Sequence, residues 1–156
     1  MSFTEQGHGY GLVQHGLVEH FLLQLFSEMA HDCTRGSWTC FESRGISDWT
    51  PAGGYTEASQ SIVPLHVKWM LVFEPPPTTA GARSLQLFKA TPRAWLTHGK
   101  RMSVKHAPTV GHGRVSMSVV SELGGATPQV HASVSLNTSM NGDVNSSSGN
   151  VTLTLR

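Results

Sequence analysis

Three carboxylates in one irregular stretch are the residues best suited to catalysis. Glu42, Asp48 and Glu57 lie in or beside the segment from Asp32 to Tyr55, which is rich in Gly, Ser and Thr and interrupts the helical spacing on either side. Pairs of carboxyl groups perform general acid–base chemistry, in which one group donates a proton and the other activates water or attacks directly. Glu42, Asp48 and Glu57 are therefore the carboxyl groups to consider for such chemistry.

Aromatic neighbours make Glu42 the first choice. Trp38, Phe41 and Trp49 flank it in the chain, and Tyr55 closes the segment. Aromatic faces stack on the apolar faces of sugar rings and exclude water from a neighbouring carboxyl group. We predict Trp38, Trp49 and Tyr55 as the substrate-binding residues.

A structural role is the alternative for the same side chains. In that interpretation Glu42 accepts local hydrogen bonds or pairs with Arg35 or Arg44, and Trp38 and Trp49 anchor a core. No motif in the sequence decides between the two interpretations.

Other chemistries have weaker support. His15 and His20 lie five residues apart, whereas a spacing of four places two imidazoles on one face of a helix. The sequence has no Gly-x-Ser-x-Gly elbow, and the glycines from Gly7 to Gly11 lack the preceding strand and the Lys-Ser/Thr ending of a phosphate loop. We predict no metal and no cofactor.

The charge balance and the apolar runs limit the partners. The 156 residues carry a net charge of +1 with 13% charged residues, which gives no basic footprint for nucleic acid or for an acidic membrane. Met1 to Tyr10 lacks the features of a secretion signal, and the run from Val67 to Phe73 is too short to cross a bilayer. We expect a soluble protein with no nucleic-acid or membrane partner, and we assign no location.

Cys33 and Cys40 are the only cysteines. Their closeness permits a small-loop disulfide in an oxidising compartment. Two free thiols are the favoured interpretation, because two cysteines do not make a disulfide framework.

The first half of the sequence favours helices. Apolar residues recur at three- and four-residue spacing from Val13 to Met29. The glycine-rich start from Met1 to Gly11 is expected to be an ordered loop or a frayed end. A second helix is predicted from Thr56, whose hydroxyl can cap it, to Phe73. Pro64 lies inside this range, so the helix either begins near Pro64 or is kinked there, and the first option costs less free energy.

The second half alternates polar and apolar residues. Three consecutive prolines follow Glu74 and mark a boundary, and Arg114–Val119, Gln129–Leu136 and Asn150–Arg156 then alternate as strands do. The predicted class is α+β. We predict a helical segment over 1–74, a Pro-rich linker over 75–84 and an antiparallel β-domain over 85–156.

The order and spacing of the sequence motifs from Leu85 to Leu123 resemble those of a known family. A Pro-Arg-Ala-Trp-Leu turn-and-strand unit is followed by a Gly-Lys-Arg-Met-Ser-Val return and a Gly-Arg-Val-Ser-Met-Ser-Val strand. Together with the helical segments before it, this sequence resembles the C-terminal end of bacterial six-hairpin (α/α-toroid) glycosidases. The resemblance covers roughly Val13 to Leu136. The resemblance implies two toroid-type helices followed by an antiparallel β-sandwich.

The same resemblance implies a site and a function. Toroid active sites are built from the connections between helices, so the resemblance implies Glu42, Asp48 and Glu57 as the catalytic candidates. The chain is expected to be the C-terminal part of a glycoside hydrolase-like protein that acts on oligo- or polysaccharides, with an α-L-rhamnosidase-like or related exo-activity. A complete toroid has twelve helices, so the chain alone is expected to be inactive and to self-associate through exposed helical faces. The alternative is a non-catalytic carbohydrate-binding or structural β-sandwich module.

Overall fold

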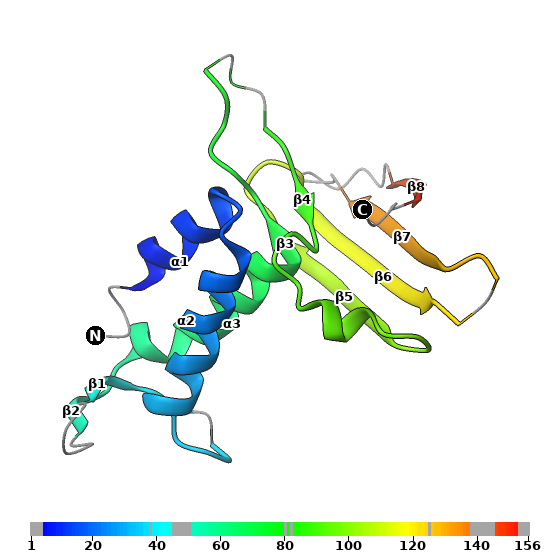
Figure 1. The fold of residues 1–156 in the computed structure, drawn as a ribbon. Helices are drawn as coiled ribbons and strands as arrows, with labels where there is room; N and C mark the ends of the chain where they lie inside the picture. Colours follow the sequence, from blue (N-terminus) through cyan, green and yellow to red (C-terminus); the bar gives the residue numbers. More distant parts are fainter. Residues whose placement is uncertain are drawn as a thin grey trace. The chain divides into compact units, whose positions relative to one another are not determined.

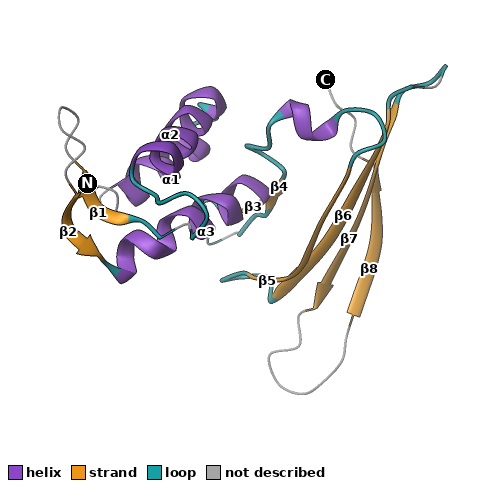
Figure 2. Cartoon of the chain, turned by 90° about the horizontal axis from the view of Figure 1, so that it is seen from below, coloured by secondary structure: helices purple, strands orange, loops and turns teal. Residues whose placement is uncertain are grey.

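The computed structural model describes residues 5–37, 39–44, 51–79, 81, 83–124, 126–137 and 146–152. The chain divides into two compact units, and each is described by itself. The N-terminal unit comprises Met1–Pro75 with Gln86–Ala90, and the C-terminal unit comprises Pro76–Leu85 with Thr91–Arg156. Helices dominate the first unit and an antiparallel sheet dominates the second (Figures 1 and 2), so the chain has the predicted α+β class.

The described part of the N-terminal unit contains three α-helices, one more than the sequence predicted. They are α1 (Glu5–Gln14), α2 (Val18–His31) and α3 (Glu57–Leu71). The glycine-rich start is therefore helical, and the prediction of a loop there was wrong. Glycine has poor helix propensity, but packing of a helix against its neighbours routinely outweighs propensity. In α1, Leu12 and Val13 are buried in the core.

The turn between α1 and α2 explains why the predicted helix from Val13 to Met29 is interrupted. The Gly16 amide donates to the Val13 carbonyl at 3.1 Å, and the Leu17 amide donates to the Leu12 carbonyl at 2.9 Å. This pair of bonds is a Schellman motif, and Gly16 adopts the left-handed conformation (φ 73°) that the motif requires. The backbone therefore reverses at Gly16 before the second helix begins.

Helix α3 begins where the sequence predicted, but Pro64 lies inside the helix and not at its start. The side chain of Thr56 accepts from the Ser59 amide at 3.3 Å, which confirms the predicted cap. Pro64 lies inside the helix, which runs without a break from Glu57 to Leu71, so the favoured start near Pro64 was wrong. The last two residues of the predicted helix, Val72–Phe73, instead form strand β3, which pairs antiparallel with β4 (Gln86–Leu87).

The core of this unit is assembled from all three helices and the β3–β4 ribbon. Its buried residues are Leu12, Val13, Phe21, Leu25, Met70, Phe73 and Ala90.

A crosslinked hairpin connects α2 to α3. Cys33 and Cys40 form a disulfide and also an isolated antiparallel bridge, so the favoured prediction of two free thiols was wrong. The spacing in sequence did not reveal the local hairpin that brings the two sulfurs together. Strands β1 (Phe41–Arg44) and β2 (Pro51–Tyr55) follow as a second antiparallel pair. The Gln60 side chain of α3 donates to the Cys40 carbonyl at 2.7 Å and accepts from the Cys40 amide at 3.1 Å, which ties the connection to the helix.

In the C-terminal unit, the described strands form a four-stranded antiparallel sheet in the order β5-β6-β7-β8. The strands are β5 (Arg101–Pro108), β6 (Arg114–Glu122), β7 (Gln129–Asn137) and β8 (Ser146–Thr152). The Pro-Arg-Ala-Trp-Leu segment was predicted to be a turn-and-strand unit, which was wrong, because Arg93–Leu96 form the short 3-10 helix η2. The predicted strand over Asn150–Arg156 overlaps β8, and its last four residues lie outside the described part.

The alternation predicted for β6 and β7 is confirmed. Val115, Met117 and Val119 are buried, whereas Ser116 and Ser118 on the other face are partly exposed. The apolar positions of β6 pair across the sheet with those of β7, in the register Val115↔Leu136, Met117↔Val134 and Val119↔Ala132. The period-2 pattern is thus matched across neighbouring strands.

The Cys33–Cys40 disulfide gives the first testable outcome. In the unreduced protein neither cysteine should titrate with a thiol reagent, even in denaturant. Reduction should lower the free energy of unfolding by about 2–3 kcal/mol, because the crosslink closes a short loop. Urea unfolding of the oxidised and reduced protein measures this change, and a Cys33→Ser/Cys40→Ser variant should match the reduced protein. Two reactive thiols in unreduced, unfolded protein would contradict the pairing.

Candidate functional site

Glu42 occupies a fixed position in the β1–β2 hairpin. The pairing register shifts beside it, so that Gly53 and Gly54 of β2 together oppose Glu42 of β1, which is a β-bulge. Both glycines have positive φ (73° and 67°), a conformation that other residues rarely adopt. The Glu42 carboxylate lies so close to Gly53 that any side chain at position 53 would collide with it. The carboxylate therefore packs directly on the backbone of the opposite strand.

Tyr55 lies in the same hairpin but on its other side. Its ring stacks on Phe41 with centroids 4.2 Å apart, and its hydroxyl is 3.3 Å from the hydroxyl of Thr34. Successive side chains of a strand point to opposite faces, so the Phe41–Tyr55 pair and Glu42 face opposite ways. Tyr55 is 56% exposed, which leaves an aromatic surface open to solvent.

The remaining predicted site residues are Glu57, Trp38, Asp48 and Trp49, of which the structure describes only Glu57. Glu57 is exposed in the first turn of α3, where a negative charge is favourable at the helix N-terminus, so a structural role accounts for it. Trp38, Asp48 and Trp49 lie outside the described residues. Their proximity to Glu42 therefore stays a prediction.

A buried pair between α2 and α3, formed by Glu28 and His66, was not predicted from the sequence. Nδ1 of His66 lies 3.5 Å from Oε2 of Glu28, and the two side chains are 0% and 1% exposed. The His66 ring is flanked by Phe21 and Trp69, each with a centroid distance of 5.5 Å. The available signal was a histidine within the almost entirely apolar stretch of α3. Removing one member of such a pair leaves the other buried without its partner, which is costly.

Gly9 of α1 lies against the His66 ring. A side chain on Gly9 would place its Cβ only 2.5 Å from Nε2 of His66. The absence of a side chain allows α1 to approach α3 at this point. The pair therefore lies where the three described helices meet, enclosed on all sides, and it is suited to holding the helices together rather than to contacting a substrate.

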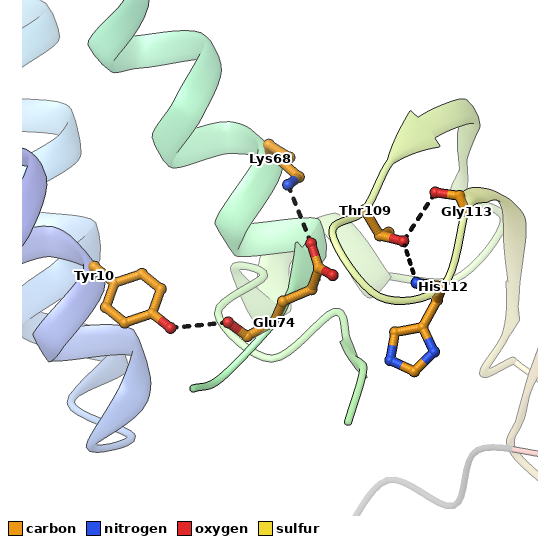
Figure 3. Close-up of polar contacts among 6 residues, drawn as sticks. All are labelled: Tyr10, Lys68, Glu74, Thr109, His112 and Gly113. Atoms are coloured by element: carbon orange, nitrogen blue, oxygen red, sulfur yellow. Dashed lines mark hydrogen bonds and ion pairs between the residues drawn. The ribbon is translucent and has the colours of Figure 1, made fainter. Parts of the chain in front are cut away.

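A second polar contact joins α1 to Glu74, the residue that follows β3 (Figure 3). The Tyr10 hydroxyl donates to the Glu74 carbonyl at 2.9 Å, and the Lys68 amine donates to the Glu74 carboxylate at 3.4 Å. The Tyr10 ring packs on Trp69 and Phe73, with centroids 5.2 and 5.0 Å away. Burial raises the pKa of the Tyr10 phenol, and the nearby Glu74 carboxylate raises it further.

Figure 3 also shows how the β5–β6 turn is closed in the C-terminal unit. The Thr109 hydroxyl donates to the Gly113 carbonyl at 2.8 Å and accepts from the His112 amide at 3.0 Å. These bonds occupy the threonine hydroxyl, so we assign the turn a structural role.

The other end of the sheet carries a concave surface of about 580 Å³, lined by His98, Gly99, Val120, Ser121, Glu122, Gly124 and Thr127. Nδ1 of His98 accepts from the Gly124 amide at 2.9 Å, which fixes the orientation of the imidazole. The exposed Glu122 carboxylate lies 3.4 Å from the His131 imidazole. Within the described part of the chain, no three or more His, Cys, Asp or Glu side chains gather as metal ligands.

Comparisons with known proteins identify no relative. No family model, curated protein or solved structure matches the chain. Among the described helices, none is long and apolar enough to cross a membrane.

Replacing Tyr10 tests the hydrogen bond between α1 and Glu74. Tyr10→Phe should lower the free energy of unfolding at pH 7 by about 1 kcal/mol, the typical value of one hydrogen bond. Because the folded state raises the pKa of Tyr10, the stabilisation is complete below the unfolded pKa of about 10 and is lost as the pH rises through the folded value. The difference between wild type and Tyr10→Phe should therefore narrow in alkaline solution.

Urea unfolding of both proteins at pH 7 and in alkaline buffer measures that difference. Tyr55→Phe, which removes an exposed hydroxyl, is the matched control and should cost less at pH 7. A difference for Tyr10→Phe that grows with pH would contradict the assigned contact.

Proposed function

We propose that this chain is the C-terminal part of a glycoside hydrolase-like protein that acts on oligo- or polysaccharides. In this proposal the helices are the last ones of an α/α toroid, and the sheet belongs to a β-sandwich cap. The order of elements supports it, since helices precede an antiparallel sheet as the family resemblance implies. The resemblance itself rests on the sequence from Leu85 to Leu123 and on the helical segments before it.

An exposed apolar surface on α2 supports a larger helical assembly. Leu23 is 68% exposed and Phe26 is 47% exposed, three residues apart and therefore neighbours on the helix surface. The opposite side of α2 buries Phe21 and Leu25 in the core. Further toroid helices would cover the exposed side. We propose that the isolated chain self-associates through this surface, as large exposed apolar patches commonly do.

The position of Glu42 is the observation that carries the catalytic proposal. Its strand lies in the connection between two helices, and that connection is held by the Cys33–Cys40 disulfide and by the Gln60 hydrogen bonds. The bulge at Gly53 fixes the carboxylate further. A carboxyl group held rigidly at a helix–helix connection is suited to donate a proton to a leaving oxygen or to activate water, because its position is set before substrate binds.

A second carboxyl group is required for hydrolysis of a glycosidic bond. Asp48 is the candidate within this chain, since Glu57 is exposed at the start of α3. We propose that much of the surface that would hold the sugar and place the second group belongs to the rest of the toroid. The chain alone is then inactive, because acid–base catalysis depends on both groups being positioned.

The alternative is a non-catalytic carbohydrate-binding module. Such modules commonly stack sugar rings on exposed aromatic side chains. From Thr91 to Arg156 the sequence contains a single Phe, Tyr or Trp, namely Trp95. An aromatic row on the sheet is therefore impossible, and binding there would have to use polar groups.

Glu42→Gln in a longer protein that contains this chain and the remaining helices tests the catalytic role. Turnover should fall roughly 100- to 10,000-fold, the typical contribution of general acid–base assistance, while sugar binding changes little. Initial rates and equilibrium binding on the same oligosaccharide measure the two effects. Glu19→Gln, which alters an exposed carboxylate of α2, is the control and should keep full turnover. Full turnover of Glu42→Gln would leave Glu42 as a structural carboxylate.

A further inference from the structure

A shallow trough crosses one face of the sheet in the C-terminal unit. Five serines and one lysine line it together with Val104 and Met117, with Ser103 and Lys105 on β5, Ser116 and Ser118 on β6, and Ser133 and Ser135 on β7. We call this surface the serine trough. Its volume is about 200 Å³.

The strand register explains how the serines come together. Ser103, Ser118 and Ser133 are paired in one row across three strands, and Ser116 pairs with Ser135 in the next row. Neighbouring strands lie about 4.8 Å apart, so the row presents hydroxyl groups at regular intervals. Serine is smaller than the β-branched and aromatic residues that usually fill a sheet surface, and its small size leaves the trough open.

Basic residues border the trough. Lys105 lines it, and Arg101 and Arg114 are exposed on the same face according to the strand register. The Arg114 guanidinium donates to the His106 carbonyl at 3.4 Å. This bond holds it beside the shift in the β5–β6 register between Val104 and Ala107. None of the six polar residues that line the trough is acidic. On the same face, the Glu122 carboxylate lies towards the other end of β6, next to His131.

We propose that the serine trough binds an acidic polysaccharide, a chain of uronic acid residues. Lysine and arginine side chains bind carboxylates by charge-assisted hydrogen bonds, and serine hydroxyls can donate to or accept from sugar hydroxyls. The trough has no aromatic residue, so neither stacking on neutral sugar rings nor stacking on nucleic-acid bases is available there. The inference extends the proposed carbohydrate function by naming a ligand class, and it concerns a surface other than that of Glu42.

Calorimetric titration of the full chain with a galacturonate oligomer tests the proposal. Binding should weaken about tenfold in Lys105→Gln, equivalent to about 1.4 kcal/mol, and should also weaken with added salt. Ser118→Glu, which places a carboxylate in the trough, should abolish binding, whereas Ser118→Thr should retain it. Lys100→Gln removes an exposed lysine that does not line the trough, and it should bind as wild type does.

The outcomes separate the competing explanations. Equal affinity for a neutral galactose oligomer of the same length, or unchanged binding in both Lys105→Gln and Ser118→Glu, would overturn the proposal. Tighter binding of single-stranded DNA than of the galacturonate oligomer, with the same dependence on Lys105, would replace it with a nucleic-acid surface. Absence of glycan binding together with a loss of turnover in Glu42→Gln would overturn this inference alone and leave the proposed hydrolase function standing.

Discussion

The helical unit depends on the close approach of α1 to the buried imidazole of His66. Gly9 permits that approach because it has no side chain to collide with the ring. Glu28 of α2 lies against the same imidazole, so one residue of α3 contacts both other helices. Once α2 and α3 are fixed to each other, the chain between them must begin and end at fixed points. The disulfide and the Gln60 hydrogen bonds then hold the part of that connection that leads to Glu42.

The C-terminal unit uses one alternating pattern for two purposes. Residues of β6 such as Val115 and Met117 are buried on one face, and the serines between them line the trough on the other. Because the register of β6 with β7 matches apolar to apolar residues, it also matches serine to serine. The polar surface is therefore a direct consequence of the register that builds the core. The two proposals concern separate surfaces, a fixed carboxylate in the helical unit and a basic, hydroxyl-lined face in the sheet.

Sequence patterns predicted the elements that depend on interactions between residues close together in the chain. The strands β6 and β7 follow from strict alternation, and the start of α3 follows from the capping hydroxyl of Thr56. The glycine-rich α1 was missed because its stability comes from packing on His66, which no local pattern encodes. Pro64 was misjudged for a similar reason. The Thr56 cap and the Gln60 hydrogen bond hold the turns before Pro64, and the buried His66 and Met70 hold the turns after it.

The candidate site was predictable only in part. The family resemblance directed attention to the segment that contains Glu42 and Tyr55, and both residues do lie in one hairpin. Their opposite orientation depends on the strand alternation and on the bulge at Gly53, and neither was visible before the pairing was known. The Glu28–His66 pair joins residues 38 positions apart on two helices. Such a contact depends on how the helices pack, so the sequence alone did not indicate it.

Single Gly→Ala replacements along α1 test most directly whether this helix packs on His66. An added methyl group has open space at Gly7 and Gly11 but meets the imidazole at Gly9. Gly7→Ala and Gly11→Ala should each raise the free energy of unfolding by up to about 1 kcal/mol, through better helix propensity. Gly9→Ala should lower it by about 1–3 kcal/mol, because overpacking forces the helices apart. Urea unfolding of the three variants decides the matter, and a Gly9→Ala variant as stable as Gly7→Ala and Gly11→Ala would contradict the close approach of α1 to His66.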